Sequence, residues 1–162
     1  MSIKTLLFIA GWTLLPISEL RGGIPIAHEN GMGTLPAYLF CVIINMLIAP
    51  IVFLFLNSLH KLLYKISWYK KIFDKLALRS REKISSKLDK YGYLGLMIFV
   101  GIPLPVTGAY TGALGAWILG LKPVKSCIFI GIGVAIAGII ITLVWVFGIG
   151  FLIPLFTKTV NA

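Results

Sequence analysis

The sequence predicts an all-α integral membrane protein with two inverted repeats, each a re-entrant helical hairpin plus one transmembrane helix, within a single membrane domain over residues 1–162. Three observations predict this fold class. Apolar residues make up 59% of the chain and charged residues 12%, whereas a soluble domain carries about 25% charged residues. Two interrupted apolar stretches are each followed by an uninterrupted one. A basic region separates the two pairs.

Two segments have the length and composition of ordinary transmembrane helices. They run from Leu35 to Leu59 and from Ser126 to Phe156. Each exceeds the roughly 20 apolar residues that cross the hydrocarbon core of a bilayer. The first segment closes the first repeat, residues 1–59, and the second closes the second repeat, residues 91–162.

Two other apolar stretches, Thr5 to Met32 and Tyr91 to Leu121, are interrupted near the middle by charged, proline or glycine residues. Each divides into two arms of about 10 to 14 residues, which are too short to span a bilayer separately. We therefore expect two re-entrant hairpins, whose tips must face protein or water because lipid cannot satisfy their backbone groups. No small-residue cleavage site follows the first arm, so this arm is expected to stay in the mature protein.

A basic region, residues 60–90, joins the two repeats. It contains ten of the fifteen Lys and Arg residues and three of the five acids, a net charge of +7. The positive-inside rule places it in the cytoplasm, and its spaced apolar residues predict an amphipathic helix on the membrane surface. It acts either as a topology anchor or as a contact for anionic lipids. The candidates for lipid contact are Lys70, Lys71, Arg79 and Arg81.

The two halves share the pattern P-x-[ST]-x4-G-x3-A-x3-G at an offset of 89 residues. A hairpin followed by one span crosses the bilayer once, so two such units joined in the cytoplasm are inverted relative to each other. Inverted repeats with broken helices are a recurring transporter plan. We expect the first hairpin to enter from outside and the second from the cytoplasm, with both termini outside. The matched residues are Pro16, Ser18, Gly23, Ala27 and Gly31, and Pro105, Thr107, Gly112, Ala116 and Gly120.

Glu19 and Arg21 place two charges at the first hairpin tip, inside an apolar stretch. A charge at the centre of a membrane helix costs about 2.5–3.5 kcal/mol on insertion scales, so it needs compensation or a purpose. Residues two apart do not face one another on a regular helix. Either the backbone unwinds beside Gly22-Gly23, or each charge pairs elsewhere. The pair is interpreted as a substrate or proton site, or as a fixed ion pair that holds the tip.

The arm after this tip is expected to be a half-helix from Ile24 to Gly31, with Pro25 in its first turn, where amide donors are free. Those amides and Arg21 would suit an anionic group such as a phosphate. His28 and Glu29 lie at the far end of the arm, where they are interpreted as solvated interfacial residues.

The second tip carries no charge, so it can complete a cavity but cannot supply ionic chemistry alone. Asn45 and Pro50 in the first span are candidates for lining the same cavity, although an isolated interhelical hydrogen bond explains Asn45 equally well. A stripe of small residues at every fourth position is interpreted as helix packing. The stripe is Gly108, Gly112, Ala116 and Gly120. The candidate tip residues are Pro103, Pro105, Thr107, Tyr110 and Thr111.

Other kinds of chemistry have no signal in the sequence. Cys41 and Cys127 lie in apolar runs without ligand-type neighbours, so they are interpreted as packing residues. No catalytic triad, metal-ligand cluster or phosphate-binding glycine loop stands out. We therefore expect no enzyme activity, cofactor or metal. Nucleic acid is not an expected partner either, because the basic residues lie beside apolar spans.

Two motifs resemble those of the putative small multidrug export family of prokaryotic membrane proteins, and the likeness covers nearly the whole chain. In this family the second motif typically has Gly and Trp where this sequence has Val106 and Tyr110. The first motif reads Ser18-Glu19-Leu20-Arg21-Gly22-Gly23-Ile24-Pro25. The second reads Pro103-Leu104-Pro105-Val106-Thr107-Gly108-Ala109-Tyr110-Thr111-Gly112-Ala113.

This family also looks distantly similar to the DedA (VTT) membrane proteins. That likeness implies two opposed re-entrant hairpins and the translocation of a lipid carrier or phospholipid. The arginines of the second DedA motif have no counterpart here, because residues 99–103 and those that follow them in the tip are uncharged.

Together, the residues and the resemblance predict a multi-pass transporter of the cell membrane. It would carry out secondary, proton-coupled export of a small molecule or translocate a lipid or lipid phosphate, with membrane lipids as partners. The alternative is a non-transporting scaffold or lipid-binding protein, and assembly into homo-oligomers is left open. The predicted substrate or proton site comprises Glu19, Arg21, Gly22, Gly23, Pro25, Pro103, Pro105, Thr107, Tyr110 and Thr111.

Overall fold

The computed structural model describes residues 2–67, 70, 88–104 and 107–148. These residues form seven α-helices and no β-strand. The fold class is therefore all-α, as the sequence predicts. The helices are α1 Ile3–Leu14, α2 Glu19–Glu29, α3 Thr34–Met46, α4 Ile48–Leu63, α6 Leu88–Gly101, α7 Ala109–Ile118 and α8 Pro123–Val146.

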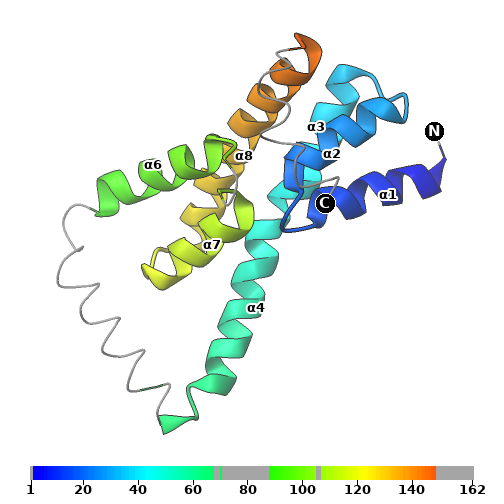
Figure 1. Ribbon diagram of the computed structural model, residues 1–162. Helices are drawn as coiled ribbons and strands as arrows, with labels where there is room; N and C mark the ends of the chain where they lie inside the picture. Colours follow the sequence, from blue (N-terminus) through cyan, green and yellow to red (C-terminus); the bar gives the residue numbers. More distant parts are fainter. Residues whose placement is uncertain (1, 68–69, 71–87, 105–106, 149–162) are drawn as a thin grey trace.

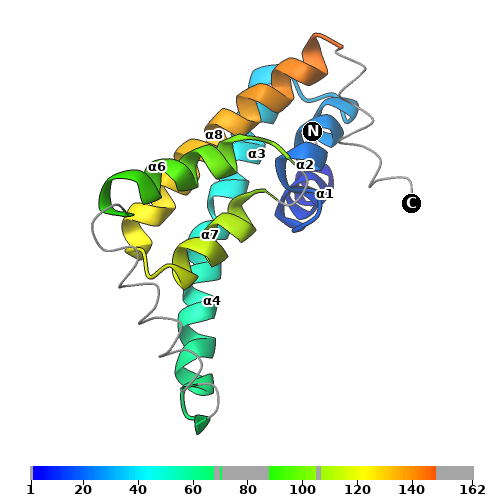
Figure 2. The same cartoon turned by 60° about the vertical axis from the view of Figure 1, so that its left-hand side comes forward.

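Two pairs of short helices lie on either side of a central pair of longer ones (Figures 1 and 2). The first pair, α1 and α2, packs on α3, and the second pair, α6 and α7, packs on α8. The two halves also exchange contacts, because α2 touches α8 while α7 touches α4. The turns that join each pair point toward each other in the middle of the molecule.

Two helical segments are long and apolar enough to cross a membrane. They are Thr34–His60 and Pro123–Val146, each with a mean hydropathy of 2.8. Leu47 separates α3 from α4 but keeps a right-handed helical backbone (φ −69°, ψ −18°), so the two helices continue one another. These segments match the two spans predicted from sequence. The predicted end of the second span, Phe156, lies outside the described residues.

The short helices α1 and α6 are apolar but too short to span a bilayer by themselves. Large apolar side chains cover much of the outer surface, including Ile3, Leu54 and Val124, each at least 70% exposed. Apolar patches of this extent suit contact with lipid or another protein. The chain thus has the composition and the surface of a membrane protein.

Glycines allow the central helices to pack closely. A Cβ added at Gly133 of α8 would lie 2.7 Å from the carbonyl oxygen of Met97 in α6. A Cβ added at Gly138 would lie 2.7 Å from Cγ2 of Val42 in α3. Small residues permit such close backbone approach between membrane helices. Thus α8 packs closely on α6 at Gly133 and on α3 at Gly138.

The basic region falls mostly outside the described residues. The helix α4 extends into it as far as Leu63, and Lys70 is exposed, with its Nζ 5.4 Å from the centre of the Tyr64 ring. The lipid-contact candidates Lys71, Arg79 and Arg81 lie outside the described residues. The predicted surface helix over this region therefore stays a prediction.

Candidate functional site

The first tip is a tight turn that ends at Glu19. The backbone amides of Ser18 and Glu19 both donate to the carbonyl oxygen of Leu15, at 3.1 and 2.9 Å. Among the described residues, Glu19 is the non-glycine residue with a positive φ, at 46°. This left-handed conformation costs an L-residue about 1–2 kcal/mol. Such strain persists only where the surroundings hold it, and it is typical of functional sites.

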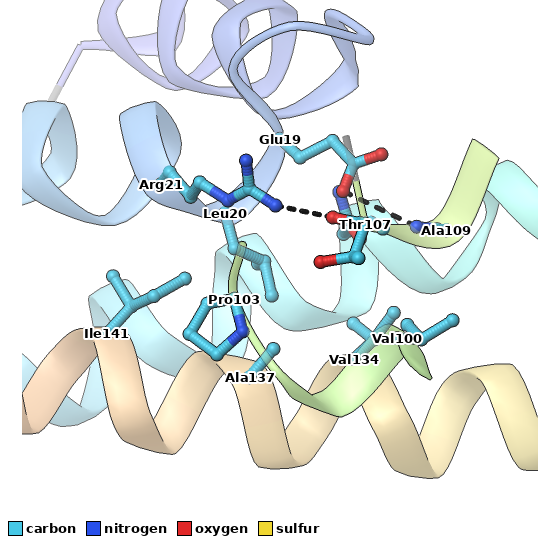
Figure 3. A pocket seen from close by; sticks show the side chains of 12 residues that line it. Glu19, Leu20, Arg21, Val100, Pro103, Thr107, Ala109, Val134, Ala137 and Ile141 are labelled. Atoms are coloured by element: carbon cyan, nitrogen blue, oxygen red, sulfur yellow. Dashed lines mark hydrogen bonds between the residues drawn. The ribbon is translucent and has the colours of Figure 1, made fainter. Parts of the chain in front are cut away.

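Glu19 reaches across to the second half of the chain. Its carboxylate oxygens accept from the backbone amide of Ala109 at 3.4 Å (Figure 3) and from that of Tyr110 at 3.5 Å. These amides begin α7, and the free amides and macrodipole at a helix N-terminus attract negative charge. The second tip, which carries no charged residue, therefore binds the Glu19 carboxylate of the first tip.

Gly108 provides the space for this carboxylate. A Cβ at position 108 would lie 2.6 Å from the carboxyl carbon of Glu19. The next residue of the small-residue stripe, Gly112, packs instead against Val100, whose Cγ2 would lie 2.6 Å from an added Cβ. The predicted packing role fits Gly112 and the buried Ala116. At Gly108 the absence of a side chain instead leaves room for the Glu19 carboxylate.

Arg21 makes the matching contact with the turn that follows α6. Its Nη2 donates to the carbonyl oxygen of Thr107 (Figure 3) and to that of Leu104. The hydroxyl of Thr107 orders this turn, because it donates to the carbonyl of Ile102 at 2.7 Å and accepts from the amide of Leu104 at 3.0 Å. Thr107 is thus both a ligand of Arg21 and the residue that shapes the second tip.

Tyr110 returns the contact to the first tip. Its hydroxyl donates to the carbonyl oxygen of Leu14, the last residue of α1, at 2.6 Å. Arg21 and Tyr110 are 89 positions apart, the offset of the repeated pattern. Glu19 and Gly108 are also 89 apart. Arg21 and Tyr110 thus each contact the opposite tip, while the Glu19 carboxylate occupies the space beside Gly108.

Thr111, another predicted tip residue, acts within the second half. Its hydroxyl accepts from the amide of Gly108 at 3.1 Å, so it caps the start of α7. Pro103 lines the cavity described below. Pro105 lies outside the described residues.

Three predicted residues of the first tip lie inside a helix. The arm was expected to begin at Ile24 with Pro25 in its first turn, but α2 begins at Glu19, so Gly22 and Gly23 are helical. Of the two alternatives for the charges, the one in which each pairs elsewhere therefore applies. A Cβ at Gly23 would lie 3.1 Å from Cβ of Thr13, and one at Gly22 would lie 3.2 Å from Cβ of Ser18. The two glycines therefore bring α2 close to α1 and to the turn.

A small cavity lies beneath the two tips (Figure 3). Glu19, Arg21, Pro103 and Thr107 are predicted site residues that line it. Asn45 lines it as well and also donates from Nδ2 to the carbonyl oxygen of Thr13 at 3.2 Å, so both interpretations of Asn45 apply. Pro50 is exposed in the first turn of α4 and is not a lining residue.

Sequence reasoning missed the apolar wall of this cavity. Val100 of α6 and three residues of α8 supply it. The three α8 residues are Val134, Ala137 and Ile141, at the i, i+3, i+7 spacing of one helix face. That spacing was a usable signal, but α8 is apolar on all sides, so its sequence does not distinguish an inward face from a lipid-facing one.

An apolar, all-helical chain with two span-length helices has the character of a membrane protein. The family model described as putative small multi-drug export protein matches residues 19–140, and the chain belongs to this family. The resemblance indicated by the two tip motifs is therefore confirmed. No curated protein matches the chain, and no solved structure matches it. The likeness to DedA proteins stays a prediction.

Proposed function

We propose that the protein is a secondary transporter, in which Glu19 and Arg21 couple the two tips to the passage of a small molecule or lipid. The observation that carries this proposal is the pair of charged contacts across the tips. Glu19 binds the start of α7, and Arg21 binds the carbonyls beyond α6. Any separation of the tips breaks both.

Charge makes this contact sensitive to its surroundings. An ionised group at membrane depth is costly unless it is compensated, and Glu19 and Arg21 obtain their compensation from the opposite half of the chain. A proton or a ligand on Glu19 weakens its attraction to the amides of α7. Binding can in this way release the tips, which is the differential interaction that a conformational change requires.

The arrangement of the two halves supports an inverted-repeat transporter. Besides the tip contacts, His28 and Trp117 are 89 positions apart at the ends of α2 and α7. The His28 ring stacks on Trp145 of α8 with centroids 6.3 Å apart, and Trp117 meets the His60 ring of α4 at 5.4 Å. Each short arm thus contacts the long helix of the other half. In the proposed topology, the hairpins enter from opposite faces of the membrane.

The cavity is small for a transported molecule. It has room for about one water molecule, far less than the roughly 300–1,000 Å³ of pockets that enclose drug-sized ligands. The tips are closed over it by the contacts of Glu19, Arg21 and Tyr110. In the proposed cycle, this is the occluded state, and the tips part to admit substrate.

Reconstituted transport tests the proposal. We would measure uptake of ethidium and flipping of a fluorescent phospholipid in proteoliposomes with an imposed pH gradient. Glu19→Gln and Arg21→Ala are expected to reduce transport at least tenfold, because each removes a charged contact. If Glu19→Gln reduces transport of the dye more than that of the lipid, the cargo is cationic. If Arg21→Ala reduces transport of the lipid more than that of the dye, the cargo carries a phosphate.

The matched control is Glu29→Gln, which removes an exposed carboxylate at the far end of α2. It is expected to transport as the unmodified protein does. Full activity of both Glu19→Gln and Arg21→Ala would exclude the proposed site.

The second candidate is a scaffold that binds anionic lipid through the basic region. It is favoured by the ten Lys and Arg residues between positions 60 and 90, each worth about 1 kcal/mol near an anionic surface. The lipid contacts in this proposal are Lys70, Lys71, Arg79 and Arg81. Under this candidate, replacing the four residues with Gln would weaken vesicle binding, while Glu19→Gln would leave it unchanged.

A further inference from the structure

Asn45 carries a buried oxygen without a hydrogen-bond partner among the described residues. The residue is 1% exposed, and its Oδ1 has no partner in the described part of the chain. Leaving a buried acceptor unpaired costs about 1–3 kcal/mol, and such atoms in native proteins call for an explanation. Asn45 lines the cavity beneath the tips.

The orientation of the Asn45 amide is determined by its neighbour. Its Nδ2 donates to the carbonyl oxygen of Thr13 at 3.2 Å. A flipped amide would place Oδ1 against that carbonyl, and two acceptors repel. The Thr13 hydroxyl is already engaged, since it donates to the carbonyl of Ile9 at 2.8 Å. Oδ1 is therefore the atom that Asn45 holds available.

The other polar groups on the cavity wall favour a donor as the partner of Oδ1. The Glu19 carboxylate accepts two long amide bonds and has further lone pairs to offer. Arg21, the cation on the wall, donates to the carbonyls of Leu104 and Thr107. The opposite wall is apolar. An anion in contact with Asn45 Oδ1 and the Glu19 carboxylate would meet two acceptors, whereas a donor in contact with them would satisfy both.

From this geometry we infer that Asn45 Oδ1 and the Glu19 carboxylate form a binding site for a protonated primary amine. This inference rests on the proposed transport function and names its substrate class. A primary ammonium carries three N–H donors, as a lysine does, and one positive charge that the Glu19 carboxylate attracts. The ammonium head is about the size of a water molecule, so it suits a cavity too small for a whole drug-sized ligand.

Two probes of equal charge test the donor requirement. Benzylammonium has N–H donors, and benzyltrimethylammonium has none. Their dissociation constants would be measured by titration calorimetry on the full chain in detergent. The unmodified protein is expected to bind benzylammonium more tightly, and Asn45→Leu is expected to reduce this preference about tenfold, because one hydrogen bond to a charged group is lost. Asn45→Asp, which keeps an acceptor, is expected to retain the preference.

The ratio of the two constants keeps the test valid if a variant folds less well, because both probes see the same folded fraction. The matched control is Asn57→Leu, since Asn57 of α4 is exposed and its Oδ1 accepts from Trp117 Nε1 at 3.0 Å instead. Its ratio is expected to equal that of the unmodified protein. A ratio unchanged in Asn45→Leu, or benzylphosphonate bound in place of benzylammonium, would overturn the inference.

Failure of this inference is distinguishable from failure of the proposed function. If Glu19→Gln stops transport while Asn45→Leu leaves the ratio unchanged, the transport site stands and the amine site does not. If Glu19→Gln transports normally, the transport proposal fails whatever the ratio shows.

Discussion

The Glu19 carboxyl group fills the space that a side chain at position 108 would need. A side chain at position 108 would collide with the Glu19 carboxyl group, whose Cδ would lie 2.6 Å from an added Cβ. The two positions are equivalent under the 89-residue offset. One half of the chain thus supplies the carboxylate and the other supplies the room for it.

We predict that Gly108→Ala destabilises the protein by about 1–3 kcal/mol, the usual cost of overpacking a filled site. In a Glu19→Ala background this cost should largely disappear, because the colliding carboxyl group is gone. Unfolding is measured in mixed micelles for the unmodified protein, Gly108→Ala, Glu19→Ala and the double variant. This double-mutant cycle gives the coupling free energy between positions 19 and 108.

Gly115→Ala serves as the control for Gly108→Ala. A Cβ at this position of α7 would meet no atom within 4 Å, so only the small gain in helix propensity is expected, up to about 1 kcal/mol. Equal costs of Gly108→Ala with and without Glu19 would contradict the shared space.

At the scale of elements, α8 is the helix against which both halves pack. It contacts α3 of the first half and α6 of the second. Gly133 faces the backbone of α6, because an added Cβ would lie 2.7 Å from the carbonyl oxygen of Met97 and 3.2 Å from the amide nitrogen of Gly101. Backbone atoms cannot move aside as flexible side chains can, so this contact sets the distance between α6 and α8.

We predict that Gly133→Ala lowers the unfolding free energy by about 1–3 kcal/mol, because α6 must move away from α8. Gly131→Ala, two positions earlier on the same helix, is the matched control. Its Cβ would meet only the flexible Met46 side chain at 3.8 Å, an ordinary contact. Detergent unfolding followed by circular dichroism measures both, and equal stability of the two variants would contradict the role of Gly133.

At the scale of the whole molecule, each pair of short helices contacts the other half of the chain in two places. The tips meet in the middle through Glu19, Arg21 and Tyr110. The far ends of α2 and α7 contact α8 and α4 through ring pairs. If the hairpins enter from opposite faces of the membrane, these ring pairs lie near opposite surfaces, where His, Tyr and Trp side chains are well accommodated.

The proposed inverted topology predicts that Ser2 and Lys70 lie on opposite sides of the membrane. Single cysteines at these positions, in a background without Cys41 and Cys127, would be labelled with a membrane-impermeant maleimide in intact cells. Ser2→Cys should react from outside, and Lys70→Cys should react only after the cells are opened, because the basic region favours the cytoplasm.

The control is the cysteine-free protein without an added cysteine, which should not be labelled. Reaction of both single cysteines from the same side would contradict the inverted repeats, because the first hairpin would then cross the bilayer instead of returning.

The sequence by itself determined the helical plan. Lengths of apolar runs and the positions of proline, glycine and charge are local properties, so they indicated two spans, two short helical pairs and the family. They also singled out Glu19 and Arg21, because charge inside an apolar stretch is costly wherever the chain folds. Their functional role remains a proposal.

Only the tertiary structure decided what each of these residues touches. That α2 begins at Glu19, that Gly22 and Gly23 pack α2 on α1, and that Gly108 makes room for a carboxylate 89 positions away could not be read locally. Hydropathy records how much apolar surface a segment must bury, but not which neighbour buries it. The contacts of Glu19 and Arg21 depend on how two distant turns approach each other, and α8 contributes to that approach because it packs against both α2 and α6.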